Sequence, residues 1–177
     1  MYLPKIASLG LFLASSCLVS AESQSFGLYA YGDNVGGLPM YYADGNAVVA
    51  PNPPSNASTA VRVSFTKGDD GLVGNPNATT NSTGSKDFSD QMLFVPGPSS
   101  DDHQMGFTAN GSTNMVTNKF VWYGNFLLVE DESGEYTSLF SVPSTAGDGG
   151  SYSLLWNATD DDDVVPVTLR SIAPSNA

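Results

Sequence analysis

Short segments rich in Val, Phe, Tyr and Thr alternate along this chain with clusters of Gly, Asn, Asp, Ser and Pro, and this pattern limits the fold more than any other feature. Residues 61–66 show it best, because Val61, Val63 and Phe65 alternate with polar residues. A period of two places the apolar side chains on one face of a strand. No window combines a helical period with a helix cap. The sequence therefore predicts an all-β chain with little helix.

Three turn sequences predict hairpins. Asp44-Gly45 and Gly124-Asn125 each separate two apolar runs, and residues 67–71 separate two more. Gly, Asn and Asp tolerate the positive φ angles that a two-residue hairpin turn requires. We expect the hairpin at Gly124-Asn125 to continue into a three-stranded meander that ends at residue 142.

Other strands are expected wherever a short apolar run lies between turn residues, and residues 75–86 are expected to cross the surface because they are polar throughout. The runs outside the three hairpins are at residues 25–31, 91–95, 105–108, 152–156 and 164–170, and we expect the last two to pair with each other. Many short strands in one chain favour a single compact antiparallel domain, either a β-barrel or a β-trefoil, with a two-sheet β-sandwich as the alternative.

The N-terminus has the pattern of a secretory signal peptide. Lys5 precedes an apolar run at residues 6–19, and small residues follow as far as Ala21. The run is shorter than the roughly 20 residues that cross a bilayer. We expect residues 1–21 to be removed and residues 22–177 to form one secreted domain, without a membrane anchor.

The cysteine content indicates how the secreted domain is stabilised, and the charge narrows the possible partners. Cys17, the only cysteine, lies inside the predicted signal peptide, so the secreted domain must be stabilised by packing rather than by an internal disulfide. The formal net charge is -12, and the few Lys and Arg residues form no basic run. Nucleic acid is therefore not expected as a partner, because phosphate binding needs clustered cations.

Five Asn-x-Ser/Thr sequences with a non-proline middle residue follow the predicted signal peptide. An exported chain carries N-linked glycans at such sequences when they lie in exposed turns and loops. All five are expected in turns or loops, and we expect glycans on at least two. They are at Asn56, Asn77, Asn81, Asn110 and Asn157.

The only histidine, His103, does not indicate a catalytic or metal site. It follows Asp101 and Asp102, but no Gly-x-Ser-x-Gly sequence is present to hold a nucleophile for a Ser-His-Asp triad. A zinc site would lack both a thiol and a second imidazole. We interpret His103 as an exposed loop residue and predict no catalytic residue, metal ligand or cofactor-binding residue.

Acidic clusters at residues 130–135 and 160–163 allow two other interpretations. Adjacent carboxylates can bind calcium, but neither cluster has the spacing of a calcium loop, so solvated turns are the preferred interpretation. A glycosidase needs two carboxylates across a cleft. Asp44 or Asp33 with Glu130 would be such a pair, although an acidic β protein offers many others.

Aromatic residues are frequent enough to form a surface that stacks on sugar rings. Trp and Tyr are also ordinary strand and core residues. Core packing is the preferred interpretation for the two tryptophans, because each lies in an apolar strand. The residues concerned are Tyr29, Tyr31, Tyr41, Tyr42, Trp122, Tyr123 and Trp156.

Three segments near the start of the predicted secreted domain resemble small secreted fungal proteins, including proteins of the cell wall and the spore wall. They are Ser25-Phe26-Gly27-Leu28, the segment at residues 38–45 and the segment at residues 61–74, which ends in Asp-Gly-Leu-Val-Gly. The resemblance covers about the first third of that domain and implies a location at the wall. It supplies no catalytic residue.

Together these features favour a non-catalytic, secreted N-glycoprotein that acts at the cell wall or at a host or environmental interface by binding a polysaccharide or a cell-surface protein. The alternative is a small secreted hydrolase that acts on polysaccharide through paired carboxylates. A third possibility is a soluble component of the wall whose acidity and glycans are its only function.

Overall fold

The computed structural model describes residues 24–77, 88–158 and 163–175. The predicted signal peptide lies outside the described residues. Within them the regular structure consists of fifteen strands and one short 3-10 turn, Asp148–Gly150. The prediction of an all-β chain with little helix is confirmed.

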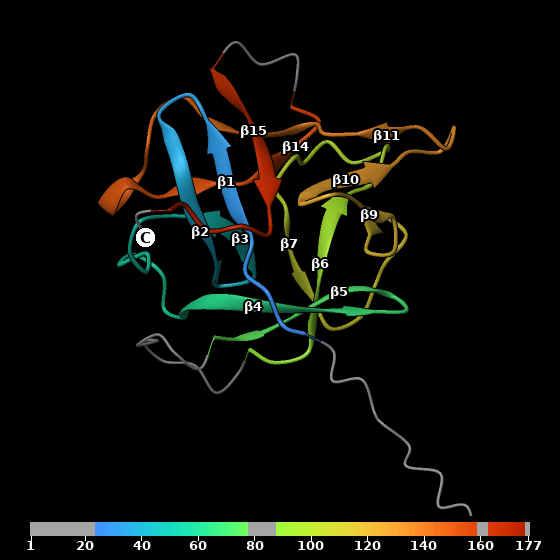
Figure 1. Cartoon of the computed structure of the whole chain (residues 1–177), viewed down its shortest axis with the longest axis horizontal. Coiled ribbons are helices and arrows are strands. Elements are labelled where there is room, and N and C mark those ends of the chain that lie inside the picture. The colour runs from blue at the N-terminus through green and yellow to red at the C-terminus, as the bar shows by residue number, and fades with distance from the viewer. Residues whose placement is uncertain (1–23, 78–87, 159–162, 176–177) are drawn as a thin grey trace, which may run out of the picture.

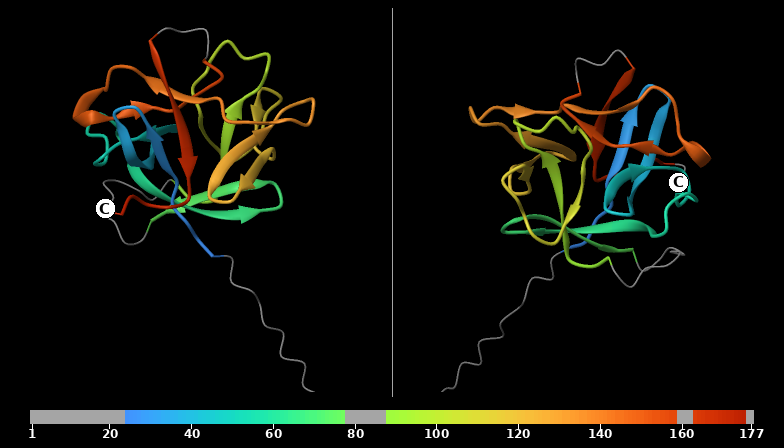
Figure 2. Two further views of the ribbon diagram at one scale, coloured as in Figure 1. Left: turned by 45° about the horizontal axis from the view of Figure 1, so that its top comes forward. Right: turned by 180° about the vertical axis from the view of Figure 1, so that it is seen from behind.

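Six strands form a closed antiparallel barrel, which Figures 1 and 2 show from three directions. Each strand pairs with the next, and the last pairs with the first, so the barrel has no free edge. Among the architectures that the sequence left open, the structure is a barrel. In order around it the strands are β2 (Val35–Ala43), β4 (Ala60–Gly68), β5 (Gly71–Pro76), β6 (Gln91–Pro96), β7 (Gly106–Thr108) and β3 (Asn46–Val49).

A second group of strands extends the sheet outward from β2. β1 (Tyr29–Gly32) pairs with β2 and with β15 (Val164–Arg170), which lies beside it in Figure 1. β15 then pairs with β10 (Phe126–Glu130), the middle strand of the meander. The flanking strands of the meander are β9 (Phe120–Tyr123) and β11 (Tyr136–Thr137), so the three predicted strands form a meander, but its third strand ends at Thr137 and not at residue 142.

Four short strands complete the structure. They are β8 (Met115–Val116) against β6, β12 (Phe140–Pro143) against β14 (Leu155–Trp156) and β15, and β13 (Tyr152–Ser153) against β3.

The alternating pattern of residues 61–66 places the core as expected. Val61, Val63 and Phe65 are buried, whereas the polar residues between them are half-buried. Rings from β7 and from the segment before β6 pack near Phe65, with Phe107 stacked on it at 6.2 Å and Phe88 edge-on to Phe107 at 5.3 Å. The barrel interior is therefore filled by side chains and stabilised by apolar burial.

All three predicted hairpins form: in the one at residues 67–71, Gly68 pairs with Gly71, and local turn chemistry explains the other two. Asp44 and Gly45 have φ angles of 48° and 97°, and Ala43 pairs with Asn46 directly across the turn. Gly124 has φ 60°, and the strands on either side of Gly124-Asn125 are in register from their first residues. Both central residues of the first turn are thus in the left-handed region that the tight hairpin requires.

The predicted pairing of residues 152–156 with residues 164–170 is wrong. Residues 152–156 form two short strands, β13 and β14, which pair with β3 and β12, while β15 pairs with β1, β10 and β12. Residues 136–142 are likewise divided between β11 and β12, which have different partners. Pairing between distant segments depends on which buried faces meet, and runs of apolar residues do not specify this.

Strand boundaries also differ from those expected. β5 continues through Asn75 and Pro76, at the start of the segment 75–86 that was expected to cross the surface, and residues 78–87 lie outside the described part of the chain. β2 begins at Val35, directly after the Asp33-Asn34 turn, because Val35 is buried in the core.

Candidate functional site

A groove of about 600 Å³ lies beside the base of the β9–β10 hairpin. The end of β6 and the loop at residues 96–103 form one side, and β10 with the β10–β11 turn forms another. The end of β14 also contributes. Residues far apart in the sequence therefore meet at one surface.

The floor of the groove is apolar. Val95 and Val129 belong to the buried core and also line the groove, and half-buried Val116 and Leu139 extend this surface. Trp156 is half-buried, and its ring packs against Phe140 at a centroid distance of 4.9 Å. Trp156 thus contacts the core and lines the groove, which refines the expectation of core packing alone.

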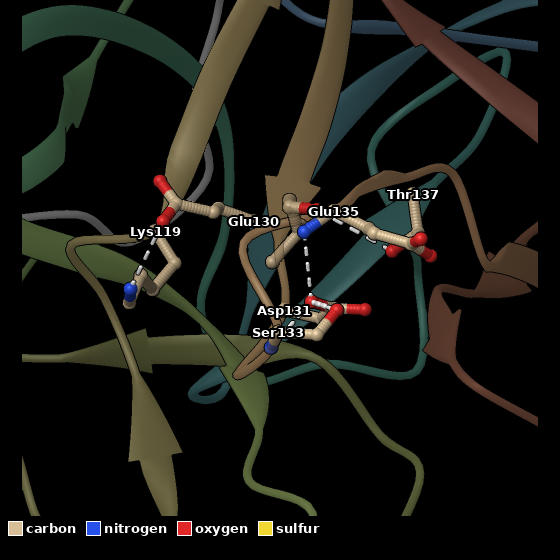
Figure 3. A network of polar contacts seen from close by, with 7 residues as sticks. Lys119, Glu130, Asp131, Ser133, Glu135 and Thr137 are labelled. Carbon is tan, nitrogen blue, oxygen red and sulfur yellow. Dashed lines mark hydrogen bonds and ion pairs between the residues drawn. The ribbon is translucent and has the colours of Figure 1, made fainter.

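Polar side chains at the rim of the groove take part in the contacts that Figure 3 shows. Lys119 Nζ lies 3.4 Å from Glu130 Oε1, in a pair whose side chains are both substantially exposed. Asp131 Oδ1 accepts hydrogen bonds from Ser133 Oγ at 2.7 Å, from Ser133 N at 2.8 Å and from Glu135 N at 2.9 Å. The Ser133 hydroxyl, followed by the Glu135 amide, lowers the pKa of the Asp131 carboxyl below its ordinary value.

His103 is exposed, as expected, and is tied to Trp156 by two hydrogen bonds. Its carbonyl accepts a bond from Trp156 N at 2.9 Å, and its Nδ1 lies 3.0 Å from Trp156 O. Because a carbonyl only accepts, Nδ1 carries the proton and Nε2 has no described partner. Among the described residues no hydroxyl bonds the ring, and the Ser100 hydroxyl donates instead to the Asp102 carbonyl.

The groove is acidic. Asp102, Glu130, Asp131 and Glu132 line it, whereas Lys119 is the only Lys or Arg among its described lining residues. In the part of the chain that the structure describes, no group of His, Cys, Asp and Glu is arranged to hold a metal ion. Residues 160–162 of the second predicted acidic cluster lie outside the described residues.

The carboxylate pairs considered from the sequence do not share this groove. Glu130 lines it, but Asp44 lines a separate hollow of about 400 Å³, and Asp33 lies in the turn between β1 and β2. Asp44 instead accepts hydrogen bonds from Ser58 N and Thr59 N, both at 2.8 Å. Its carboxylate therefore organises a loop.

Four of the five predicted glycan acceptors lie in the described residues. Asn56, Asn110 and Asn157 are exposed, and Asn157 lines the groove. Asn77 directly follows β5 and is half-buried, with its N–H donating to Arg62 O at 2.8 Å. Asn81 lies outside the described residues.

The seven aromatic residues considered for sugar stacking do not form one flat surface. Tyr41 is buried, and this burial raises the pKa of its phenol above the ordinary value, with Arg62 acting in the opposite direction. Trp122 packs edge-to-face against Phe26 at 5.2 Å, as expected of a core residue. Trp156 is the member of this set that lines the groove.

Sequence reasoning did not connect Trp156 with His103, Lys119 and Glu130. Asp102 and His103 were recognised as neighbours, but their association with residue 156 depends on a non-local backbone pairing that begins near the Gln104–Leu155 bridge. No local sequence signal identifies that pairing.

No protein-family model, curated protein or solved structure matches this chain. Across the residues that the structure describes, no helix has both the length and the apolar composition of a membrane span.

Proposed function

We propose that this protein is a secreted N-glycoprotein that binds carbohydrate without modifying it, at the cell wall or at a host or environmental interface. The observation that carries the proposal is the placement of Trp156 in a groove with an apolar floor and a polar rim. Export and glycosylation enter the proposal from the N-terminal pattern and the acceptor sequences.

The apolar and polar residues that line the groove match the C–H faces and the hydroxyl groups of a sugar ring. An aromatic ring can pack against the C–H groups of a pyranose, while amides and carboxylates bond its hydroxyl groups. Trp156 supplies the ring, and Asn118, Glu130 and Asp102 supply polar groups around it. The acidic rim favours neutral or cationic sugars, because an anionic ligand would be repelled.

The described chemistry supports binding more than hydrolysis. A glycosidase acid must keep its proton near neutral pH, which requires a raised pKa. The hydrogen bonds to Asp131 lower its pKa, and Glu130 is paired with Lys119. The hydrolase alternative would need an acid other than Asp131 in this groove.

Binding by the secreted chain to a panel of neutral and amino polysaccharides tests the proposal, with Trp156→Phe and Trp122→Phe as matched variants. Trp122 is also half-buried and packed on an aromatic ring, but it does not line the groove. We expect Trp156→Phe to weaken binding by about threefold to tenfold and Trp122→Phe to leave it unchanged.

Absence of binding to every polysaccharide in the panel would contradict the proposal, as would equal losses in the two variants. Release of reducing ends from any bound polysaccharide would instead favour the hydrolase. Retention of the protein in a purified wall fraction would test its proposed location.

A further inference from the structure

Arg170, at the end of β15, lies between two aromatic rings. Its guanidinium carbon is 4.9 Å from the centroid of Tyr31 and 4.4 Å from that of Phe126. Both rings are fixed by the sheet, since Phe126 pairs with Arg170 across β10 and β15, and Tyr31 belongs to the adjacent β1. The cation is therefore held in place by packing on two sides.

No carboxylate in the described part of the chain lies within salt-bridge distance of Arg170, although the chain has 18 Asp and Glu residues. No described residue accepts a hydrogen bond from its guanidinium, and its Nε is buried without a partner. The donors that remain for a ligand are the two terminal Nη groups. Such a guanidinium matches a carboxylate in charge and in geometry.

A hollow of about 330 Å³ opens beside this guanidinium. Phe126 and Ile172 line it and are 37% and 53% exposed, and Tyr123, opposite Phe126 across the hairpin, is 77% exposed. Asn125 and Ser175 add an amide and a hydroxyl to the lining. The hollow thus combines a cation, apolar walls and neutral polar groups.

Hydrogen bonds between distant segments hold the hollow together. The Tyr31 hydroxyl donates to Ile172 O at 2.8 Å, and Ser171 N donates to Asn125 O at 3.0 Å. The strand β1, the tip of the β9–β10 hairpin and the segment after β15 are thereby fixed to one another. A site whose walls are already positioned loses little entropy when it binds a ligand.

We propose that the Arg170 hollow binds the carboxylate of an acidic sugar, a uronate residue of a polysaccharide. The guanidinium takes the carboxylate, the apolar walls contact the C–H groups of the ring, and Asn125 and Ser175 are placed for its hydroxyls. The volume is at the small end for ligand sites and suits one sugar unit rather than a longer segment. The site is separate from the acidic groove, which lies at the other end of the β9–β10 hairpin.

Calorimetric titration of the whole secreted chain with a short oligouronate, and with its methyl ester, tests this assignment. We expect the free acid to bind at least about tenfold more tightly than the neutral ester, because the charged hydrogen bonds are lost in the ester. Arg170→Gln should remove this preference, and Arg170→Lys should retain part of it. Arg62→Gln is the matched control, since Arg62 also lies over a tyrosine ring but outside the hollow.

Equal affinity for the acid and the ester would overturn the assignment, and so would an equal loss in Arg62→Gln. Stronger binding of a short polyglutamate than of the oligouronate would replace the sugar with an acidic peptide. Thermal unfolding of each variant identifies losses caused by misfolding, and Arg170→Lys keeps the test decisive if Arg170→Gln does not fold. Trp156→Phe should leave uronate binding unchanged, which separates this site from the groove.

Discussion

Gly74 on β5 lies where three core side chains leave no room for a β-carbon. A Cβ built there would be 2.9 Å from Val63 Cγ1, 3.1 Å from Phe88 Cζ and 3.2 Å from Phe107 Cε1. We expect Gly74→Ala to lower the free energy of unfolding by about 1–3 kcal/mol, because a packed core must shift to accept the methyl group. Urea denaturation measures the change.

The matched control for this substitution is Gly36→Ala on β2. Apart from its two chain neighbours, no described residue has a heavy atom within 4 Å of a Cβ at Gly36, so the methyl group would enter open space. The free energy of unfolding of the Gly36→Ala variant should equal that of the unsubstituted protein or be slightly higher. Similar losses in the two variants would show that crowding at Gly74 is not the cause.

Ionisation of the Asp131 carboxyl makes the stability of the folded protein depend on pH. Its pKa is lowered from the ordinary value of 3.8, so folding favours its ionised form. The resulting stabilisation is present above pH 3.8 and is lost as the pH falls through the lower pKa of the folded state. We expect Asp131→Asn to lower the Tm at neutral pH, with the difference disappearing under strongly acidic conditions.

Glu132→Gln provides the comparison for Asp131→Asn, because it removes the same charge from the same turn without removing a described hydrogen bond. Its Tm should match that of the unsubstituted protein at neutral pH. A Tm difference for Asp131→Asn that stays constant down to strongly acidic pH would contradict the linkage.

Hairpins are the elements that the sequence predicts well, because their determinants are adjacent residues. The Asp44-Gly45 turn adopts the backbone that these two residue types favour, and Val61, Val63 and Phe65 face the core as their spacing requires. Partners of β13, β14 and β15 were not predictable in this way. Those pairings depend on buried faces brought together from distant parts of the chain.

The candidate sites, like the pairings of β13, β14 and β15, depend on contacts between distant parts of the chain. Trp156 was recognised as an aromatic residue of an apolar strand, but its place in the groove depends on the pairing of residues near 104 and 155. Arg170 meets Tyr31 only because the last strand pairs with the first. Neither neighbourhood has a local sequence signature, so residue types alone could not identify it.

Asp44 links the β2–β3 hairpin to the loop that carries Asn56. Its carboxylate accepts the amides of Ser58 and Thr59, and its φ of 48° is in the left-handed region. We expect Asp44→Ala to lower the free energy of unfolding by about 1–2 kcal/mol and to speed amide exchange at both amides. Denaturation and hydrogen exchange measure these effects.

Asp44→Asn separates the contribution of the side-chain hydrogen bonds to this loss of stability from that of the left-handed backbone conformation. Asn tolerates the same backbone conformation and keeps one side-chain acceptor, so it should lose less stability than Asp44→Ala. If the amides of Ser58 and Thr59 exchange equally fast in all three proteins, Asp44 does not hold the loop.

At the scale of the whole molecule, the candidate sites lie where strands outside the barrel meet one another or meet the end of a barrel strand. All six barrel strands lie between residues 35 and 108. The groove combines the end of β6 and the loop at residues 96–103 with β10 and β14, whereas the Arg170 hollow draws on β1, the tip of the β9–β10 hairpin and the end of β15. β1 and β15 connect the barrel to β10 by pairing the ends of the chain. A rigid barrel with ligand-contacting loops outside it is a common arrangement for binding proteins.

A glycan on Asn157 would affect ligand binding in the groove directly. Asn157 is exposed, follows Trp156 and lines the groove, so a glycan there would occupy space beside the proposed sugar-binding surface. In protein from a glycosylating host, we expect Asn157→Gln to bind the groove ligand about threefold to tenfold more tightly than the unsubstituted protein. Titration after confirming occupancy by mass spectrometry measures this difference.

Asn110→Gln is the control for that comparison, because Asn110 is an exposed acceptor that does not line the groove. It should leave the affinity unchanged, and enzymatic removal of all glycans should give the affinity of Asn157→Gln. Equal affinities despite full occupancy at Asn157 would show that its glycan points away from the groove. An unglycosylated secreted protein would instead count against the glycoprotein assignment itself, since the acceptor sequences are its basis.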